Sequence, residues 1–131
     1  MKKDKTIFLS VSLFFFSILI DQFSKYIIRS QSGFYICNPG ISFGLTLPTF
    51  LFYPLWLVIF ATLVYIFFKK YPVHSYAILL ILAGSLSNLI DRICFGCVID
   101  FIDLKIWPVF NLADSSICIG VLLLLIQLNR K

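Results

Sequence analysis

The chain has 131 residues, of which 60% are hydrophobic and only 13% are charged, and its net charge is +5. A soluble domain usually carries about 25% charged residues, so this composition excludes a soluble globule. It predicts one integral membrane domain over residues 1–131, with no room for a separate soluble domain. The basic residues stand in small clusters at the ends of apolar runs, which is typical of topology signals and excludes a nucleic-acid partner.

Four apolar segments are each near the roughly 20 residues that a membrane-spanning helix needs. They run over about residues 6–28, 49–68, 73–93 and 111–128. The first also resembles a signal peptide, but no small-residue cleavage site follows its apolar run. We therefore expect an uncleaved first helix, in which Asp21 and Lys25 lie four residues apart on one face and can pair.

The lysines and arginines predict the orientation of these helices. Four consecutive spans place seven basic residues on one side of the membrane and four on the other. The side richer in basic residues faces the cytoplasm, so we expect both termini there. The acidic residues are more uneven, because five of the six gather at the outer ends of the helices or in the second outer loop: Asp21, Asp91, Asp100, Asp103 and Asp114.

The first outer connection, residues 30–48, is uncharged and rich in aromatic and turn-forming residues. Its stretches FYIC and ISFGLTL have strand-like content, and glycines and prolines interrupt them. This composition predicts a small sheet at the membrane surface, with an ordinary loop as the alternative.

Asp100 and Asp114 are the strongest candidates for chemistry. Asp100 follows the third span and Asp114 lies in the first turn of the fourth, so a short connection can bring them together at the outer face. Two close carboxylates in a low-dielectric site hold a single proton. Such a pair suits peptide hydrolysis without a metal or cofactor, because one member activates water while the other polarises the scissile carbonyl. Alternatively, Asp114 is only an acid that the helix dipole favours.

Two neighbouring motifs supply further candidates. Asn88, Asp91 and Arg92 of NLIDR stand at the outer end of the third helix. There Arg92 can neutralise an aspartate or hold a backbone carbonyl, and a helix-end ion pair at the interface is the alternative. Asn111 of FNLAD is either a substrate contact or a helix N-cap.

The cysteines and the single histidine are weaker signals. Cys94 and Cys97 form an isolated C-x-x-C, which is a poor zinc site and a candidate disulfide if the outer compartment is oxidising. The four cysteines are too few and too scattered for a disulfide scaffold. His74 stands beside the cytoplasmic lysines, which favours an interfacial role over catalysis.

Five motifs, in their order and spacing, resemble those of the bacterial lipoprotein signal peptidases, or type II signal peptidases. They are DQFSK, NPGISFG, GSLSNLIDR, VIDFIDL and VFNLADSS, and together they cover roughly residues 20–116. The resemblance implies an all-α membrane protein with four transmembrane helices, and a small β element and a short helix at the outer face. It implies an aspartyl endopeptidase of the bacterial cytoplasmic (inner) membrane that cleaves prolipoproteins before a diacylglyceryl-modified cysteine. We expect a monomer that contacts these substrates and membrane lipids and uses no cofactor.

Carried over motif by motif, the resemblance assigns Asp100 and Asp114 as the catalytic pair, and Asp21 and Lys25 as a structural pair. The positions that line or brace the substrate site are Asn38, Gly40, Asn88, Asp91, Arg92 and Asn111.

The chain departs from the family pattern at several small residues. Ile41 and Ser42 replace two alanines, while Ala83 and Ser87 replace glycines that allow close helix packing. The C-x-x-C pair also lies outside the pattern. An alternative function is a small ion- or proton-handling membrane protein, which predicts acids at several membrane depths, and a non-enzymatic scaffold is a third.

Overall fold

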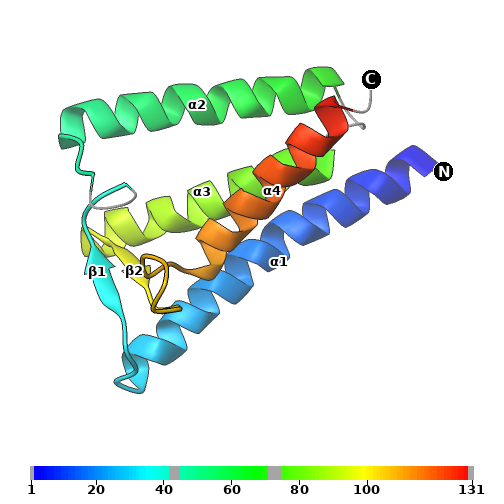
Figure 1. The fold of residues 1–131 in the computed structure, drawn as a ribbon. Helices are drawn as coiled ribbons and strands as arrows, with labels where there is room; N and C mark the ends of the chain where they lie inside the picture. The colour runs from blue at the N-terminus through cyan, green and yellow to red at the C-terminus, as the bar shows by residue number, and fades with distance from the viewer. Residues whose placement is uncertain (1, 42–44, 71–74, 130–131) are drawn as a thin grey trace.

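The computed structural model describes residues 2–41, 45–70 and 75–129. Its elements, in chain order, are α1 Lys2–Ser30, β1 Ile36–Asn38, α2 Thr49–Lys70, α3 Ser75–Phe95, β2 Val98–Asp100 and α4 Leu112–Leu128. The start of α1 and the end of α4 lie at one end of the bundle, and both strands lie at the other (Figure 1). We call the latter the sheet end. The predicted helical membrane architecture with a small β element is confirmed.

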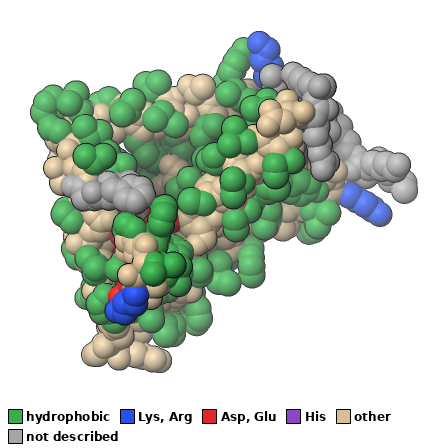
Figure 2. All heavy atoms as spheres, in the orientation of Figure 1, with side chains coloured by type: hydrophobic (Ala, Val, Ile, Leu, Met, Phe, Trp, Pro, Cys, Tyr) green, Lys and Arg blue, Asp and Glu red, His purple; other side chains and the backbone are tan. Residues whose placement is uncertain are grey.

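Within the described residues, three helices are long and apolar enough to cross a membrane, over Lys5–Ser30, Thr49–Lys69 and Tyr76–Phe95. The fourth helix, α4, is apolar and has 17 residues, which is near the lower limit for a span. Apolar side chains cover most of the visible face, and the basic side chains visible there lie toward its ends (Figure 2). This surface suits lipid rather than water. His74 lies outside the described residues.

Helix α3 is the centre of the bundle, because it packs against α1, α2 and α4. Glycines allow α3 and α4 to approach closely. A Cβ atom at Gly120 would lie 2.7 Å from the carbonyl oxygen of Ala77, and one at Gly84 would collide with the carbonyl oxygen of Ala113. Ala83, where the resemblance leads us to expect a glycine, is fully buried. The seam between α3 and α4 therefore sets the position of the start of α4.

The two strands form an antiparallel pair in which Ile36 faces Asp100 and Asn38 faces Val98. The first strand covers the last two residues of FYIC and extends to Asn38, whereas the described residues of ISFGLTL belong to neither strand of the sheet. Beyond β2, a bridge between Ile102 and Phe110 closes the loop that leads to α4. The predicted short helix is absent from the described residues of the connections 31–48 and 101–111, and residues 42–44, which include Ser42, lie outside them.

Candidate active site

Helix α4 begins with a capping box built by Asn111 and Asp114. The Oδ1 atom of Asn111 accepts a hydrogen bond from the backbone N–H of Asp114 at 2.8 Å. In return, Asp114 Oδ2 accepts one from the backbone N–H of Asn111 at 3.2 Å. Both residues therefore satisfy backbone donors that the first helical turn leaves unpaired. Asn111 is therefore the helix N-cap and Asp114 an acid of the first helical turn, as the two alternatives from the sequence proposed. Both residues also make further contacts.

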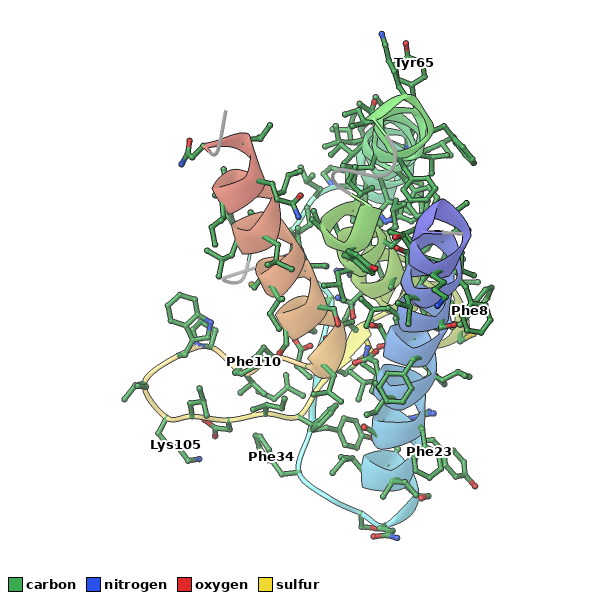
Figure 3. All side chains as sticks on the ribbon, turned by 90° about the vertical axis from the view of Figure 1, so that its right-hand side faces the viewer. Phe8, Phe23, Phe34, Tyr65, Lys105 and Phe110 are labelled. Carbon is green, nitrogen blue, oxygen red and sulfur yellow. A yellow bond between two sulfur atoms is a disulfide. The ribbon has the colours of Figure 1, made fainter. Side chains whose placement is uncertain are left out.

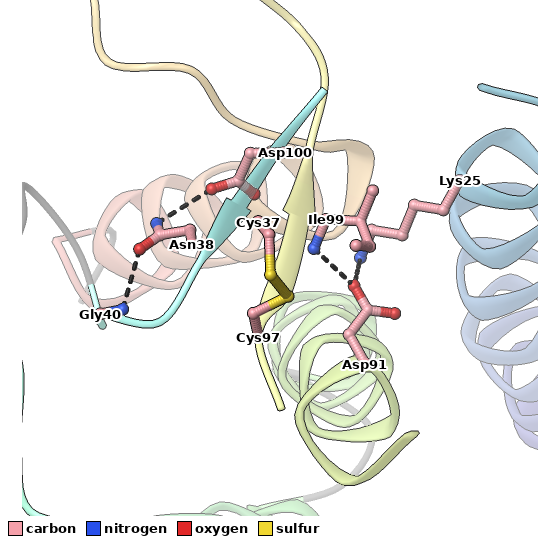
Figure 4. The surroundings of a disulfide bond; sticks show 8 residues. All are labelled: Lys25, Cys37, Asn38, Gly40, Asp91, Cys97, Ile99 and Asp100. Carbon is pink, nitrogen blue, oxygen red and sulfur yellow. Dashed lines mark hydrogen bonds and ion pairs between the residues drawn. A yellow bond between two sulfur atoms is a disulfide. The ribbon is translucent and has the colours of Figure 1, made fainter. Parts of the chain in front are cut away.

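The same Asn111 side chain also reaches the second carboxylate. Its Nδ2 atom donates to Asp100 Oδ1 at 2.7 Å. From the other side, Asn38 Nδ2 donates to Asp100 Oδ2 at 3.0 Å (Figure 4). Asp100 is 3% exposed, and a buried carboxylate needs such donors. Asn111 thus contacts both aspartates, and the structure brings the pair together as the sequence predicts.

Asn88 holds the opposite side of Asp114. Its Nδ2 atom donates to Asp114 Oδ1 at 2.8 Å. Its Oδ1 atom accepts from Lys25 Nζ and from Asn111 Nδ2, each at 3.1 Å. Because the lysine ammonium is only a donor, it requires the carboxamide oxygen to face it. The amide nitrogen of Asn88 is therefore directed at Asp114.

Lys25 lies at the centre of a buried ionic network. Its Nζ atom lies 2.7 Å from a carboxylate oxygen of Asp21 and 2.7 Å from one of Asp91, and all three side chains are at most 2% exposed. Asp21 also accepts from the backbone N–H of Ala113 at 2.8 Å, and Asp91 accepts from that of Ile99 at 3.1 Å. The network therefore connects α1, α3, β2 and α4.

Ser87 and Gln22 complete this network, and the sequence did not single out Gln22. Ser87 Oγ donates to Asp21 Oδ2 at 2.7 Å and accepts from Gln22 Nε2 at 2.9 Å. Gln22 Nε2 also lies 2.9 Å from Asp91 Oδ1. Ser87, where the resemblance leads us to expect a glycine, is fully buried and uses its hydroxyl here. The sequence feature that could have drawn attention to Gln22 is its position next to Asp21.

Gly40 and Arg92 fix the turn that follows β1. Arg92 donates from a guanidinium nitrogen to the carbonyl oxygen of Gly40 at 2.8 Å, so it holds a backbone carbonyl. The backbone N–H of Gly40 donates to Asn38 Oδ1 at 2.9 Å. This bond turns the amide nitrogen of Asn38 toward Asp100 (Figure 4).

A cavity of about 610 Å³ opens beside the two aspartates. Asn38, Asp100 and Asp114 supply its polar groups. Its other lining residues are apolar or weakly polar: Ile36, Ile41, Trp107, Pro108, Val109, Phe110, Ile117 and Cys118. Ile41, one of the family departures, therefore faces the cavity. Part of this wall belongs to the loop that extends from the bundle beside α4, between the labelled Lys105 and Phe110 (Figure 3).

The pKa values of Asp100 and Asp103 are shifted in opposite directions. Burial raises the pKa of Asp100 to about 6, and the Asp114 charge adds to this, while hydrogen bonds from Asn38 and Asn111 and the Lys25 charge act in the opposite direction. Hydrogen bonds from Lys105 instead lower the pKa of Asp103. The Lys105 ammonium lies 2.5 Å from Asp103, outside the cavity. Asp103 is therefore a separate surface charge.

The disulfide joins different cysteines from the pair that the C-x-x-C spacing suggested. Cys97 is bonded to Cys37, with 5.4 Å between their Cα atoms, whereas Cys94 is free and exposed. The bond lies beside Asn38 and joins β1 to the turn before β2 (Figure 4). The sequence could not predict this pairing, because the two cysteines are 60 residues apart.

This fold and site define a helical membrane protein with a pair of carboxylates beside a partly apolar cleft at one end of its bundle. The family model described as signal peptidase (SPase) II matches residues 13–130. A lipoprotein signal peptidase of Moorella thermoacetica is 40% identical, over 85% of this chain and 86% of the relative. One of Thermodesulfovibrio yellowstonii is 38% identical, over 93% and 95% of the two chains.

Two solved structures, each described as a bacterial membrane enzyme, have the same fold. The first has a TM-score of 0.86 and 34% identity, and the match covers 95% of this chain and 89% of that one. The second has a TM-score of 0.83 and 34% identity, with 93% of both chains covered. The chain therefore belongs to the signal peptidase II family, and it is a peptidase with membrane-spanning helices.

Proposed function

We propose that the protein is an aspartic endopeptidase that removes signal peptides from prolipoproteins, cleaving before a diacylglyceryl-modified cysteine. Relatives named lipoprotein signal peptidase, about 40% identical over most of the chain, support this substrate. The observation that carries the aspartic mechanism is the position of Asp100 and Asp114 on one cavity wall, with Asn111 contacting both.

The carboxylates act as a pair with one shared proton. The ionised member takes a proton from a water molecule, whose oxygen attacks the scissile carbonyl carbon. The protonated member donates a hydrogen bond to the carbonyl oxygen, which carries the developing negative charge. As the tetrahedral intermediate collapses, the C–N bond breaks and a proton passes to the leaving amine. Asn38, Asn88 and Asn111 keep the two carboxyl groups in position.

The cavity suits a substrate that is part peptide and part lipid. Its polar groups gather at the two aspartates, while side chains such as Ile41, Trp107 and Ile117 supply apolar walls. A pocket of this type binds apolar groups along its walls and orients them through a few polar contacts. We propose that the scissile bond lies against the aspartates and that the lipid tails lie along the apolar walls and the exposed helix faces.

The proposed location is the bacterial cytoplasmic membrane, with both termini in the cytoplasm and the sheet end outside. The excess of lysine and arginine at the terminus-bearing end supports this orientation. The Cys37–Cys97 disulfide supports it independently, because disulfides persist in oxidising compartments such as the periplasm. We propose that the protein acts there as a monomer.

Cys94 provides a direct test of this orientation. It is free and exposed at the sheet end. In the Cys118→Ser background it is the one free thiol that can be labelled. A membrane-impermeant maleimide added to spheroplasts should label it, and labelling only after lysis would contradict the orientation.

The catalytic proposal is tested with Asp100→Asn and Asp114→Asn, and with Asp103→Asn as the matched control. Each purified protein is given a diacylglyceryl-modified precursor and the same precursor without the lipid. We expect Asp103→Asn and the wild type to cleave only the modified precursor, and both other variants to be inactive. Cleavage by either Asp100→Asn or Asp114→Asn would exclude the paired mechanism.

A further inference from the structure

The Cys37–Cys97 disulfide adjoins the active site without being part of it. We propose that this bond is a redox-sensitive positioning element: it holds Asn38 against Asp100, and its reduction lowers the turnover of the peptidase. The inference rests on the catalytic role proposed above for Asp100.

Cys37 immediately precedes Asn38 on β1, and Cys97 immediately precedes β2, which ends at Asp100. The disulfide therefore joins the strand that carries the hydrogen-bond donor to the strand that carries the carboxylate. Cys97 is 3% exposed and packed, whereas Cys37 is exposed. The bond thus attaches an exposed strand to a buried one.

The non-covalent contacts between the strands are few. Each strand has three residues, and a two-stranded pair of this length is marginal in isolation. The side chains of β1 are largely exposed, whereas all three residues of β2 are buried. Burial therefore positions β2 and Asp100 but contributes little to the position of β1. Without the disulfide, we expect β1 and Asn38 to lose their fixed distance from Asp100.

The turn after β1 is connected to the disulfide through Asn38. Asn38 Oδ1 accepts from the Gly40 N–H, and the Gly40 carbonyl accepts from Arg92. These bonds attach the chain that follows Asn38 to α3. The disulfide attaches the residue that precedes Asn38, so Asn38 lies between two attachments (Figure 4). Reduction removes one attachment and leaves the second.

The redox step is an ordinary thiol–disulfide exchange. One thiolate of an external dithiol attacks the exposed Cys37 sulfur, and the S–S bond breaks with Cys97 as the leaving thiolate. The second thiol of the dithiol then releases Cys37, so the protein gains two electrons and two protons and the reductant becomes a disulfide. In the reverse direction, a disulfide-bearing oxidant accepts the same electrons and protons.

Reduction should affect turnover more than substrate binding. Most of the apolar cavity wall, from Trp107 to Cys118, belongs to the loop and to α4, which the disulfide does not join, whereas Ile36 of β1 and Ile41 of the turn after it form the rest. A displacement of about 1 Å in a positioning group can lower a rate about a hundredfold. We therefore expect kcat to fall about tenfold to a hundredfold on reduction, with a smaller change in KM.

The pH profile provides a second readout. The hydrogen bond from Asn38 lowers the pKa of Asp100. When this bond is lost, the pKa of Asp100 rises, so the fall in activity at high pH should move to a higher pH. The charged groups that face Asp100 are Asp114 of α4, Lys25 of α1 and Arg92 of α3. Asp114 and Lys25 lie on helices that the disulfide does not join to β1, so their effect should stay constant, whereas Arg92 also bonds the Gly40 carbonyl of the turn that follows β1.

The experiment measures cleavage of the lipid-modified precursor by the full-length protein in micelles, before and after treatment with a phosphine reductant. Alkylation and mass spectrometry confirm which thiols are free. We expect lower kcat and a shifted pH profile after reduction, and recovery when oxidised glutathione restores the bond. Cys94→Ser, the matched control, should respond as the wild type does. The double variant Cys37→Ser/Cys97→Ser should match the reduced wild type and ignore the reductant.

If wild-type protein with both Cys37 and Cys97 alkylated after reduction keeps the kcat and the pH profile of the oxidised protein, the inference is overturned. This test is decisive even if the double variant fails to fold. Asp100→Asn separates this failure from failure of the proposed function. If Asp100→Asn is inactive and the reduced wild type is fully active, only the disulfide inference fails. If Asp100→Asn is active, the catalytic assignment fails, and the inference fails with it.

Discussion

The Nζ atom of Lys25 lies 3.1 Å from the Oδ1 atom of Asn88, so a buried cation of α1 determines how a carboxamide of α3 faces Asp114 of α4. The motif resemblance marked Lys25 as structural. Its position connects the ionic network to the proposed catalytic pair, because the ion pairs that fix Lys25 also orient a residue that contacts Asp114.

Replacing Lys25 should therefore damage both the fold and the site. Lys25→Met leaves Asp21 and Asp91 buried without their cation, and loss of one partner of a buried ion pair typically costs about 3–5 kcal/mol. We expect a much lower thermal midpoint in detergent and little cleavage. Lys105→Met, at a largely exposed lysine, is the control and should leave the midpoint unchanged. Equal midpoints for the two variants would contradict a buried network.

The pH dependence of kcat/KM should reflect the state with one shared proton. The pKa of Asp100 is raised to about 6, so its proton is lost as the pH rises through that value. We expect the high-pH fall in kcat/KM at or above about pH 6, with an apparent pKa that belongs to the pair. Asn38→Ala removes a hydrogen bond that favours the charged carboxylate, so the pKa of Asp100 should rise and the fall should move to higher pH. A shift to lower pH would be inconsistent with this arrangement.

The turn at Gly40 should tolerate no side chain. A Cβ atom there would lie 2.7 Å from the backbone oxygen of Leu45, so Gly40→Ala must displace the turn that Asn38 and Arg92 hold. We expect kcat to fall about tenfold or more, with a smaller effect on thermal stability. Gly96→Asn is the control, because position 96 has open space and asparagine tolerates its positive φ of 73°. Similar rates for both variants would show that the turn does not position the site.

The two glycines of the α3–α4 seam should have different effects on activity. Gly84→Ala collides with the backbone of Ala113, next to Asp114, whereas Gly120 lies farther along α4 and Gly120→Ala meets the backbone of Ala77 on α3. Both changes should separate the helices and lower the thermal midpoint. Only Gly84→Ala should also reduce kcat strongly in the protein that remains folded. Thermal unfolding and initial rates measured on the same preparations test this difference, and a larger loss of kcat in Gly120→Ala would refute it.

Several features were evident from the sequence because they depend on local properties. Apolar run length set the four helices, since a spanning helix needs about 20 apolar residues whatever it packs against. The gathering of five aspartates at the outer ends of the helices followed from spacing, whereas the strand at FYIC was predicted with an ordinary loop as the alternative. The pairing of Asp21 with Lys25 followed from their separation of four residues.

Other features required the three-dimensional arrangement. The sequence left Asn111 as either a cap or a substrate contact, but its carboxamide has two ends, and the structure uses one for Asp114 and the other for Asp100. The resemblance marked Ser87 only as standing in place of a glycine that allows close helix packing, and its hydroxyl bonds Asp21 and Gln22. Cys97 was considered with its neighbour Cys94 and is bonded instead to Cys37.

The sequence by itself determined the membrane class, the helices and the residues proposed for the chemistry, because hydrophobicity and helical spacing act over short stretches of chain. The tertiary structure decided which atom of each side chain meets which partner. Many of these contacts join residues far apart in the chain, such as Asn88 with Asp114, 26 positions apart, and Asp21 with Ala113, 92 positions apart. Short-range spacing does not encode these separations, and close packing along α3 brings the groups together.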